Sequence, residues 1–133
     1  MFRHLIAKKS FKHQIECFCP DRHHAGPITI HRGDIIELTN ERQFIPDRGW
    51  YSLINMNNER HFYIALKDLD NYYDSGELVS LVDLDLKENY SKYKINAALD
   101  TGDEDTFMVF TCELKESKLL KEKIEKHLYQ RET

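Results

Sequence analysis

The sequence predicts an α+β protein in which a small antiparallel β-barrel is followed by a helical hairpin and a helical tail. Over the first seventy residues, apolar and polar side chains alternate in short runs between Gly, Pro and Asn turns, as in half-buried strands. From about Gly76 the apolar residues recur at steps of three and four, which is the period of one helix face. We therefore expect a barrel domain at residues 1–72 and a helical region at residues 73–133.

Four or five short strands account for the predicted barrel. In the run FKHQIECFC, one face carries Phe11, His13, Ile15, Cys17 and Cys19. The turn segment PDRHHAGP follows, and ITIHRGDIIEL then supplies two β-branched pieces separated by Gly33-Asp34. WYSLINM and RHFYIAL are the next two runs, with Asn57-Asn58 as the turn between them. So many short strands in so few residues are typical of a small barrel.

The helical period then runs along one face through Leu78, Val82, Leu86, Tyr90, Tyr93 and Ala97. Residues 78–86 also alternate as a strand, so the sequence leaves both structures open there. Gly102 is placed to end this helix in the left-handed conformation, and Asp103 is placed to cap the next one.

The second helix is expected to pack back onto the first. We expect Phe107, Phe110 and Leu114 to contact Ile95, Ala98 and Leu99. A continued heptad repeat would put Ser117 and Lys121 on the apolar face, so we expect a break or bend near Ser117. The tail then has its own apolar residues, Leu120, Ile124 and Leu128.

Two parts of the chain resemble known families. The middle of the predicted barrel resembles an SH3-like barrel, and the matching residues are Gly33, Asp34, Ile35, Ile36, Glu37, Gly49, Trp50 and Tyr63. This resemblance implies a fold rather than binding of proline-rich peptides. Residues 95–116 resemble the IDEAL region, a short helical segment of proteins from Bacillus-type bacteria, through Ile95, Ala98, Leu99, Asp100, Asp103, Phe107 and Leu114. That resemblance implies a compact helical hairpin and no catalytic residues.

Composition indicates a soluble cytoplasmic protein that does not act at a membrane. The chain is 41% hydrophobic and 32% charged, and it has no apolar run long enough to span a bilayer and no secretory signal. Its three cysteines are expected to be free thiols. The first seventy residues contain ten Lys/Arg and nine Asp/Glu, whereas the rest contain nine and fourteen. Nucleic-acid binding usually needs a strongly basic domain, so it is not the favoured function.

Metal binding and catalysis are both disfavoured. The residues that come nearest to a zinc site are Cys17, Cys19, His23 and His24, but their spacing is not that of a structural zinc ligand set. We expect no metal or other cofactor. His13 is interpreted as a rim or core histidine, and Asp83, Asp85, Glu104 and Asp105 as helix-surface or capping carboxylates. No phosphate-binding glycine cluster or hydrolase motif occurs, so we expect no enzyme.

Aromatic residues are the remaining candidates for a binding site. Tyr and Trp are favoured at binding hot spots, and the candidates here are Trp50, Tyr51, Tyr63, Tyr72 and Tyr73, although packing in the core accounts for at least one of them. We expect a protein-interaction or regulatory module whose partner is another protein. Two alternatives stay open, namely a nucleic-acid or translation-associated binder that uses the barrel, and a regulator that uses the Cys/His segment. The sequence leaves the oligomeric state open.

Overall fold

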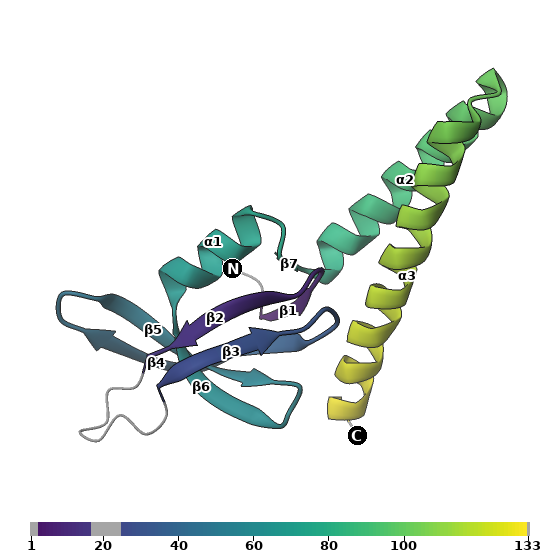
Figure 1. Cartoon of the computed structure of the whole chain (residues 1–133). Helices are drawn as coiled ribbons and strands as arrows, with labels where there is room; N and C mark the ends of the chain where they lie inside the picture. The colour runs from purple at the N-terminus through teal and green to yellow at the C-terminus, as the bar shows by residue number, and fades with distance from the viewer. Residues whose placement is uncertain (1–2, 17–24, 133) are drawn as a thin grey trace. The chain divides into compact units, whose positions relative to one another are not determined.

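The computed structural model describes residues 3–16 and 25–132, and the chain divides into two compact units, Met1–Val79 and Ser80–Thr133. All of the described strands and one short helix belong to the first unit, and two long helices form the second (Figure 1). The predicted α+β class with antiparallel strands is confirmed.

Two antiparallel sheets make up the first unit. The larger has the order β6-β5-β4-β1-β7 and consists of β1 (His4–Ala7), β4 (Ile35–Ile45), β5 (Gly49–Met56), β6 (Arg60–Ala65) and β7 (Leu78–Val79). The smaller pairs β2 (Phe11–Ile15) with β3 (Gly26–Ile30). Helix α1 (Leu66–Asp74) lies between β6 and β7 in the chain. Within the described residues, these strands form two separate sheets and no closed barrel.

Both sheets and α1 contribute to one apolar core. In Figure 1, β2 and β3 lie across one face of the larger sheet. The buried members of the core are Leu5, Ala7, Ile15, Ile30, Ile36, Leu38, Ile54, Met56, Phe62, Ile64, Leu69 and Leu78. Most of them are β-branched or long aliphatic residues at alternate strand positions, which is why these runs form strands. The first unit therefore has a hydrophobic core of its own.

The first unit extends past the boundary expected at residue 72. Ala7 and Ile6 of β1 pair with Leu78 and Val79 of β7, and Leu78 is fully buried in the core. This pairing also answers the question left open for residues 78–86. Leu78 and Val79 are in a strand, and the helix begins at Leu81.

Helix α1 is absent from the sequence-based prediction, which extended the strands to residue 72. Leu66, Leu69 and Tyr73 recur at steps of three and four, and Leu69 is 2% exposed. This helical period was not recognised in the sequence, because it follows directly on the alternating apolar and polar residues of β6. Strand β1 was missed as well.

Helix α2 (Leu81–Thr101) has a clear signal at each end. Ser80 Oγ accepts a hydrogen bond from the Asp83 backbone N–H at 3.2 Å, and the Asp83 carboxylate accepts one from the Ser80 N–H at 2.9 Å. This reciprocal pair is a capping box. At the other end Gly102 has a φ of 69°, the left-handed conformation predicted for it.

Helix α3 (Glu104–Glu132) continues without interruption, so the predicted break near Ser117 is wrong. Ser117 is 4% exposed, and Ser91 of α2 is 0% exposed. Side chains this small allow two antiparallel helices to approach closely, so the helix needs no apolar residue at position 117 in order to continue.

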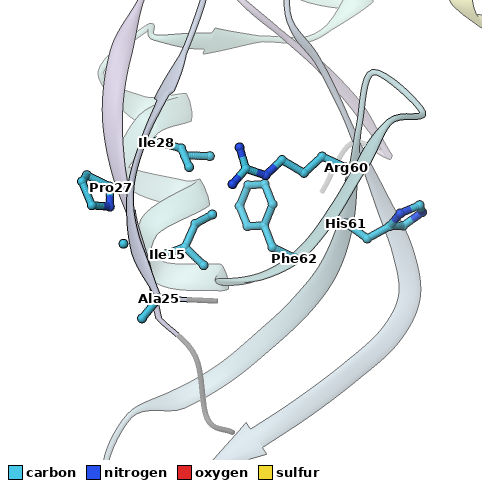
Figure 2. A pocket seen from close by; sticks show the side chains of 8 residues that line it. Ile15, Ala25, Pro27, Ile28, Arg60, His61 and Phe62 are labelled. Carbon is cyan, nitrogen blue, oxygen red and sulfur yellow. The ribbon is translucent and has the colours of Figure 1, made fainter. Parts of the chain in front are cut away.

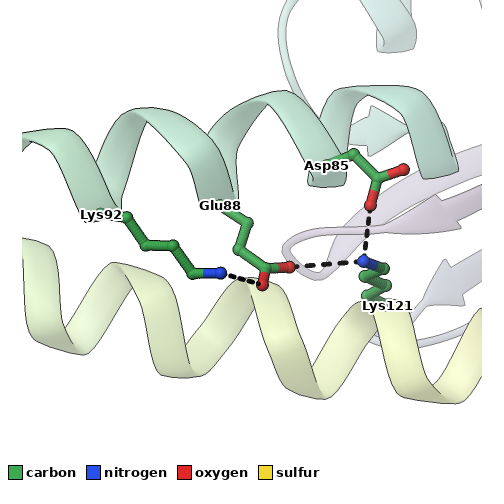
Figure 3. Close-up of polar contacts among 4 residues, drawn as sticks. All are labelled: Asp85, Glu88, Lys92 and Lys121. Carbon is green, nitrogen blue, oxygen red and sulfur yellow. Dashed lines mark hydrogen bonds and ion pairs between the residues drawn. The ribbon is translucent and has the colours of Figure 1, made fainter.

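Charged residues connect α2 to α3. Lys121 Nζ lies 2.7 Å from Asp85 Oδ1 and 3.5 Å from Glu88 Oε2, and Glu88 also pairs with Lys92 at 3.1 Å (Figure 3). The carboxylate of Asp85 raises the pKa of Lys121 through a hydrogen bond. Lys87 and Glu113 form a further interhelical pair at 2.9 Å. These interhelical pairs set the alignment of the two helices, although partly exposed ion pairs contribute little stability individually.

Two details of the predicted helix packing are different in the structure. Leu99 is 62% exposed, whereas Ala98 beside it is 3% exposed and occupies the buried face. Phe107 is only half-buried. The sequence placed both residues in the contact because neighbouring positions at helix ends differ by only 100° around the axis.

Asp103 is the N-cap of α3, and its loss should destabilise the second unit. Its carboxylate accepts hydrogen bonds from the Thr106 N–H at 3.1 Å and the Thr106 hydroxyl at 2.7 Å, and these bonds lower the pKa of Asp103. We expect Asp103→Ala to lower the unfolding free energy by about 0.5–2 kcal/mol, measured by urea denaturation. Asp103→Asn is the control, because asparagine also caps well. Equal losses in the two variants would contradict the capping role.

Candidate binding site on the β4–β5 hairpin

The hairpin of β4 and β5 ends in a tight turn that its sequence explains. Ile45 pairs with Gly49, and the Arg48 N–H donates to the Ile45 carbonyl at 3.0 Å across the turn. Asp47 has a φ of 70° and Gly49 a φ of 98°. Aspartate and glycine tolerate the left-handed region better than other residues, so this turn fixes the register of the strands that follow.

An exposed aromatic pair lies next to this turn. The register places Phe44 opposite Trp50, with ring centroids 5.3 Å apart and ring planes inclined by 59°. Phe44 is 54% exposed and Trp50 is 55% exposed. A cross-strand aromatic pair stabilises a hairpin, and half of each ring stays available to a ligand. The pair therefore forms a preordered apolar surface.

A polar network holds the turn end of this hairpin. Glu16, just after β2, accepts hydrogen bonds from the Tyr51 hydroxyl at 2.6 Å and from Arg48 Nη1 at 2.9 Å. These bonds lower the pKa of Glu16, the Tyr51 bond most strongly, and burial raises the pKa of Tyr51. Glu16 is therefore ionised and Tyr51 neutral at pH 7, the states in which these bonds form. The network connects the hairpin to β2.

Of the five aromatic residues predicted to bind, only Trp50 is strongly exposed. Tyr51 is 5% exposed and belongs to the network with Glu16. Tyr72 and Tyr73 are partly buried against the core. Tyr63 is partly exposed on β6, where burial and the nearby Glu41 raise its pKa. The structure does not bring these five residues together.

Tyr72 is instead the partner of a buried histidine. The Nδ1 of His13 lies 2.8 Å from the Tyr72 hydroxyl, and the His13 ring stacks on Phe62 at 6.1 Å between centroids. His13 is 5% exposed, and burial lowers its pKa below 6.5, partly opposed by Asp68 and Glu16. The interpretation of His13 as a core histidine therefore agrees with its position.

Phe44 was missed by sequence reasoning. Its signal is the five-residue spacing IPDRG between Phe44 and Trp50, which places the two rings opposite each other once the hairpin register is recognised.

Sequence reasoning also missed the pair of His4 and Glu37. They are paired across β1 and β4, with His4 Nε2 3.4 Å from Glu37 Oε2, and Glu37 is 2% exposed.

A small pocket lies between the β2–β3 sheet and β6, with a volume of about 280 Å³. Ile15, Ile28 and Phe62 line it, and the guanidinium of Arg60 reaches in beside the Phe62 ring, while His61 points away (Figure 2). A lining that combines apolar side chains, polar surface and one cation suits a small group that carries a negative charge. The pocket is smaller than most ligand sites, so the aromatic pair is the stronger candidate.

The predicted metal candidates Cys17, Cys19, His23 and His24 lie outside the described residues. Cys112, on α3, is an exposed free thiol.

Within the described part of the chain, no helix has the length and apolar character needed to cross a bilayer.

No family model, curated protein or solved structure matches the chain. The candidate site is therefore supported by its own geometry alone.

Titration of His13 should make stability depend on pH. Because its pKa is lower in the folded state than in the unfolded state, stability is fully present above pH 6.5 and falls as the pH drops below that value. His13→Gln cannot titrate. We expect the difference in unfolding free energy between the wild type and this variant to shrink from pH 7 to pH 5, as measured by urea denaturation. A difference that stays constant with pH would contradict this prediction.

Proposed function

We propose that the protein is a cytoplasmic, non-enzymatic interaction module that binds another protein through Phe44 and Trp50. The observation that supports this proposal is the exposure of two large rings that are already held in contact at the end of a hairpin. Rigid aromatic side chains lose little conformational entropy on binding, and they are enriched among the residues that dominate binding energy.

The surroundings of the pair are consistent with a protein partner. Arg48, in the turn of the hairpin, and Glu16, which pairs with it, have side chains 49% and 44% exposed, so both charges lie partly in solvent near the apolar surface. An apolar centre with a polar rim is the usual composition of a protein interface. The Arg48 and Glu16 side chains are paired with each other, with Arg48 Nη1 2.9 Å from Glu16 Oε2.

The two family resemblances are retained as part of the proposal. The Gly33-Asp34 turn and the Gly49-Trp50 step occur at the starts of β4 and β5, which is consistent with an SH3-like arrangement of the first unit. The capped helices around Gly102 and Asp103 are consistent with an IDEAL-like hairpin in the second unit. Neither resemblance supplies a catalytic residue.

Trp50→Ala should abolish partner binding and leave the fold intact. The full-length chain is used as bait in nuclease-treated cell extract, and retained proteins are identified by mass spectrometry. We expect one or more proteins to be retained by the wild type and lost by Trp50→Ala and by Phe44→Ala. With a purified partner, each substitution should cost about 2 kcal/mol or more of binding energy, the range of hot-spot residues.

Tyr129→Ala is the matched control, since Tyr129 is a 70% exposed aromatic residue of the second unit. It should retain the same proteins as the wild type. Trp50→Ala should also unfold at the wild-type temperature. If every retained protein binds Trp50→Ala as well as it binds the wild type, the hairpin is not the binding site. If proteins are captured from untreated extract but not from nuclease-treated extract, the alternative nucleic-acid function is favoured.

A further inference from the structure

Helix α2 presents a second exposed apolar surface, which we call the α2 stripe and define as Val82, Leu86, Tyr90, Tyr93 and Ala97. The four large side chains are 51%, 63%, 49% and 67% exposed in that order, and Ala97 is exposed as well. At 100° per residue, all five lie within about 80° of one another around the helix axis. They form a continuous row along one side of α2.

Most of the α2 stripe faces away from the contact with α3, and Tyr90 alone of its large side chains has a ring contact with α3 among the described residues, edge-on to Phe110 at 5.7 Å between ring centroids. The buried residues of α2 are Leu84, Ser91 and Ala98, which lie roughly half a turn around the axis from the stripe. The contact face of α2 thus combines one large apolar residue, Leu84, with the small residues Ser91 and Ala98, while the large side chains of the stripe are each 49% or more exposed. Contiguous exposed apolar surface of this kind marks an interaction site.

Charged residues border the α2 stripe, and their arrangement indicates the partner. Asp83, Lys87 and Lys94 lie on one flank of the stripe, and Asp85 and Lys92 lie on the other. Lys87 is paired with Glu113 of α3, which leaves Asp83 and Lys94 for contacts on its flank. In each of the two remaining pairs the acidic residue is in the first half of the helix and the lysine is in the second half. Both pairs are centred on the same point, between Glu88 and Asn89.

Such a pattern is complementary to itself in only one orientation. If two α2 helices meet stripe to stripe and antiparallel, a twofold axis near Asn89 brings each flank against the same flank of the other copy. Asp85 then lies level with the partner's Lys92, and Asp83 lies level with the partner's Lys94. In a parallel pair, acidic residues would face acidic residues and lysines would face lysines, which is repulsive.

We propose that the α2 stripe is the interface of a homodimer in which two α2 helices pair antiparallel about a twofold axis near Asn89. Leu86 of one copy packs against Tyr93 of the other, and Val82 packs against Ala97. This is an isologous contact, in which one patch meets its own copy. The dimer also carries two β4–β5 hairpins, so it can bind two partner molecules.

The flanking charges are accessible for these contacts. Asp85 keeps 48% of its side chain exposed while it pairs with Lys121, and Lys92 keeps 53% exposed while it pairs with Glu88. Lys94 Nζ lies 5.6 Å from the centre of the Tyr90 ring, at the edge of the stripe. Asp85 and Lys92 can therefore add an intermolecular contact while they keep these pairs, and Asp83 would have to make its contact with the same carboxylate that caps α2.

The first test compares two exposed leucines of the second unit. Leu86 is 63% exposed on the α2 stripe, and Leu119 is 65% exposed on α3. Sedimentation equilibrium of the full-length chain should show a dimer for the wild type. Leu86→Ala should raise the dissociation constant about tenfold or more, whereas Leu119→Ala should leave it unchanged. Thermal unfolding followed by circular dichroism should show that both variants are folded.

The second test compares two lysines that have the same local pairing. Lys92 pairs with Glu88 and Lys126 pairs with Glu122, each at four-residue spacing on a helix surface. Lys92→Glu should weaken the dimer, because it places a carboxylate level with the partner's Asp85. Lys126→Glu should not. The difference between the two variants should decrease at high salt, where exposed charges are screened.

The third test determines the orientation. In a background where the three native cysteines are replaced by serine, Asn89→Cys should form an intermolecular disulfide readily, since this position lies at the proposed axis. Val82→Cys alone should not, but it should cross-link to Ala97→Cys when the two variants are mixed. Efficient self-cross-linking of Val82→Cys would indicate a parallel pair and overturn the proposal. So would a wild-type chain that stays monomeric at all concentrations, or a dimer that Leu86→Ala leaves intact.

Discussion

Helix α2 has two different faces, and the organisation of the second unit depends on which of them packs against α3. The face in contact carries Leu84, Ser91 and Ala98, spaced seven residues apart, and its polar borders hold the ion pairs to Lys121 and Glu113. The heptad spacing and the small size of Ser91 and Ala98 allow close antiparallel packing. The consequence is that Val82, Leu86 and Tyr93, which would normally form the core of such a hairpin, face solvent.

The first unit is stabilised by a hydrophobic core that does not include its exposed aromatic pair. Its core is aliphatic and includes residues of both sheets and α1, so its stability does not require the exposed rings of Phe44 and Trp50. Those rings contact each other and are about half exposed, while Tyr51 beside them is buried and hydrogen-bonded to Glu16. Neighbouring positions 50 and 51 therefore differ in exposure, and only Trp50 is accessible for the proposed binding.

Much of this could be predicted from the sequence, because local periods report local structure. The alternation in residues 28–38 and 50–65, Gly102 as a left-handed cap and Asp103 as an N-cap all have short-range causes, and the structure has them. The secondary structure was harder to predict at positions where contacts between distant parts of the chain determine it. Residues 78 and 79 form a strand only because β1 is there to pair with them, and α3 continues through Ser117, which is buried although it is polar. The α2 stripe was recognised as a single face, but a period cannot say whether that face is buried.

The same reasoning explains the candidate site. Trp50 was identified by residue type, yet Tyr51, Tyr72 and Tyr73 have the same chemistry and are held in the fold by Glu16, His13 and the core. Phe44 became visible only through its cross-strand register with Trp50. Which aromatic residues are exposed is therefore decided by strand register and burial and not by composition.

The central claim is that the exposed apolar side chains of both units are binding surfaces. Hydroxyl-radical footprinting of the full-length chain, read by mass spectrometry at low and high protein concentration, tests it most directly. We expect Trp50, Phe44, Leu86 and Tyr93 to react readily in dilute solution and Tyr51 to be protected. On concentration, Leu86 and Tyr93 should become protected while Leu119 and Trp50 stay reactive. Protection of Trp50 or Leu86 in the dilute monomer would show that these side chains are part of a folded core and would contradict the account.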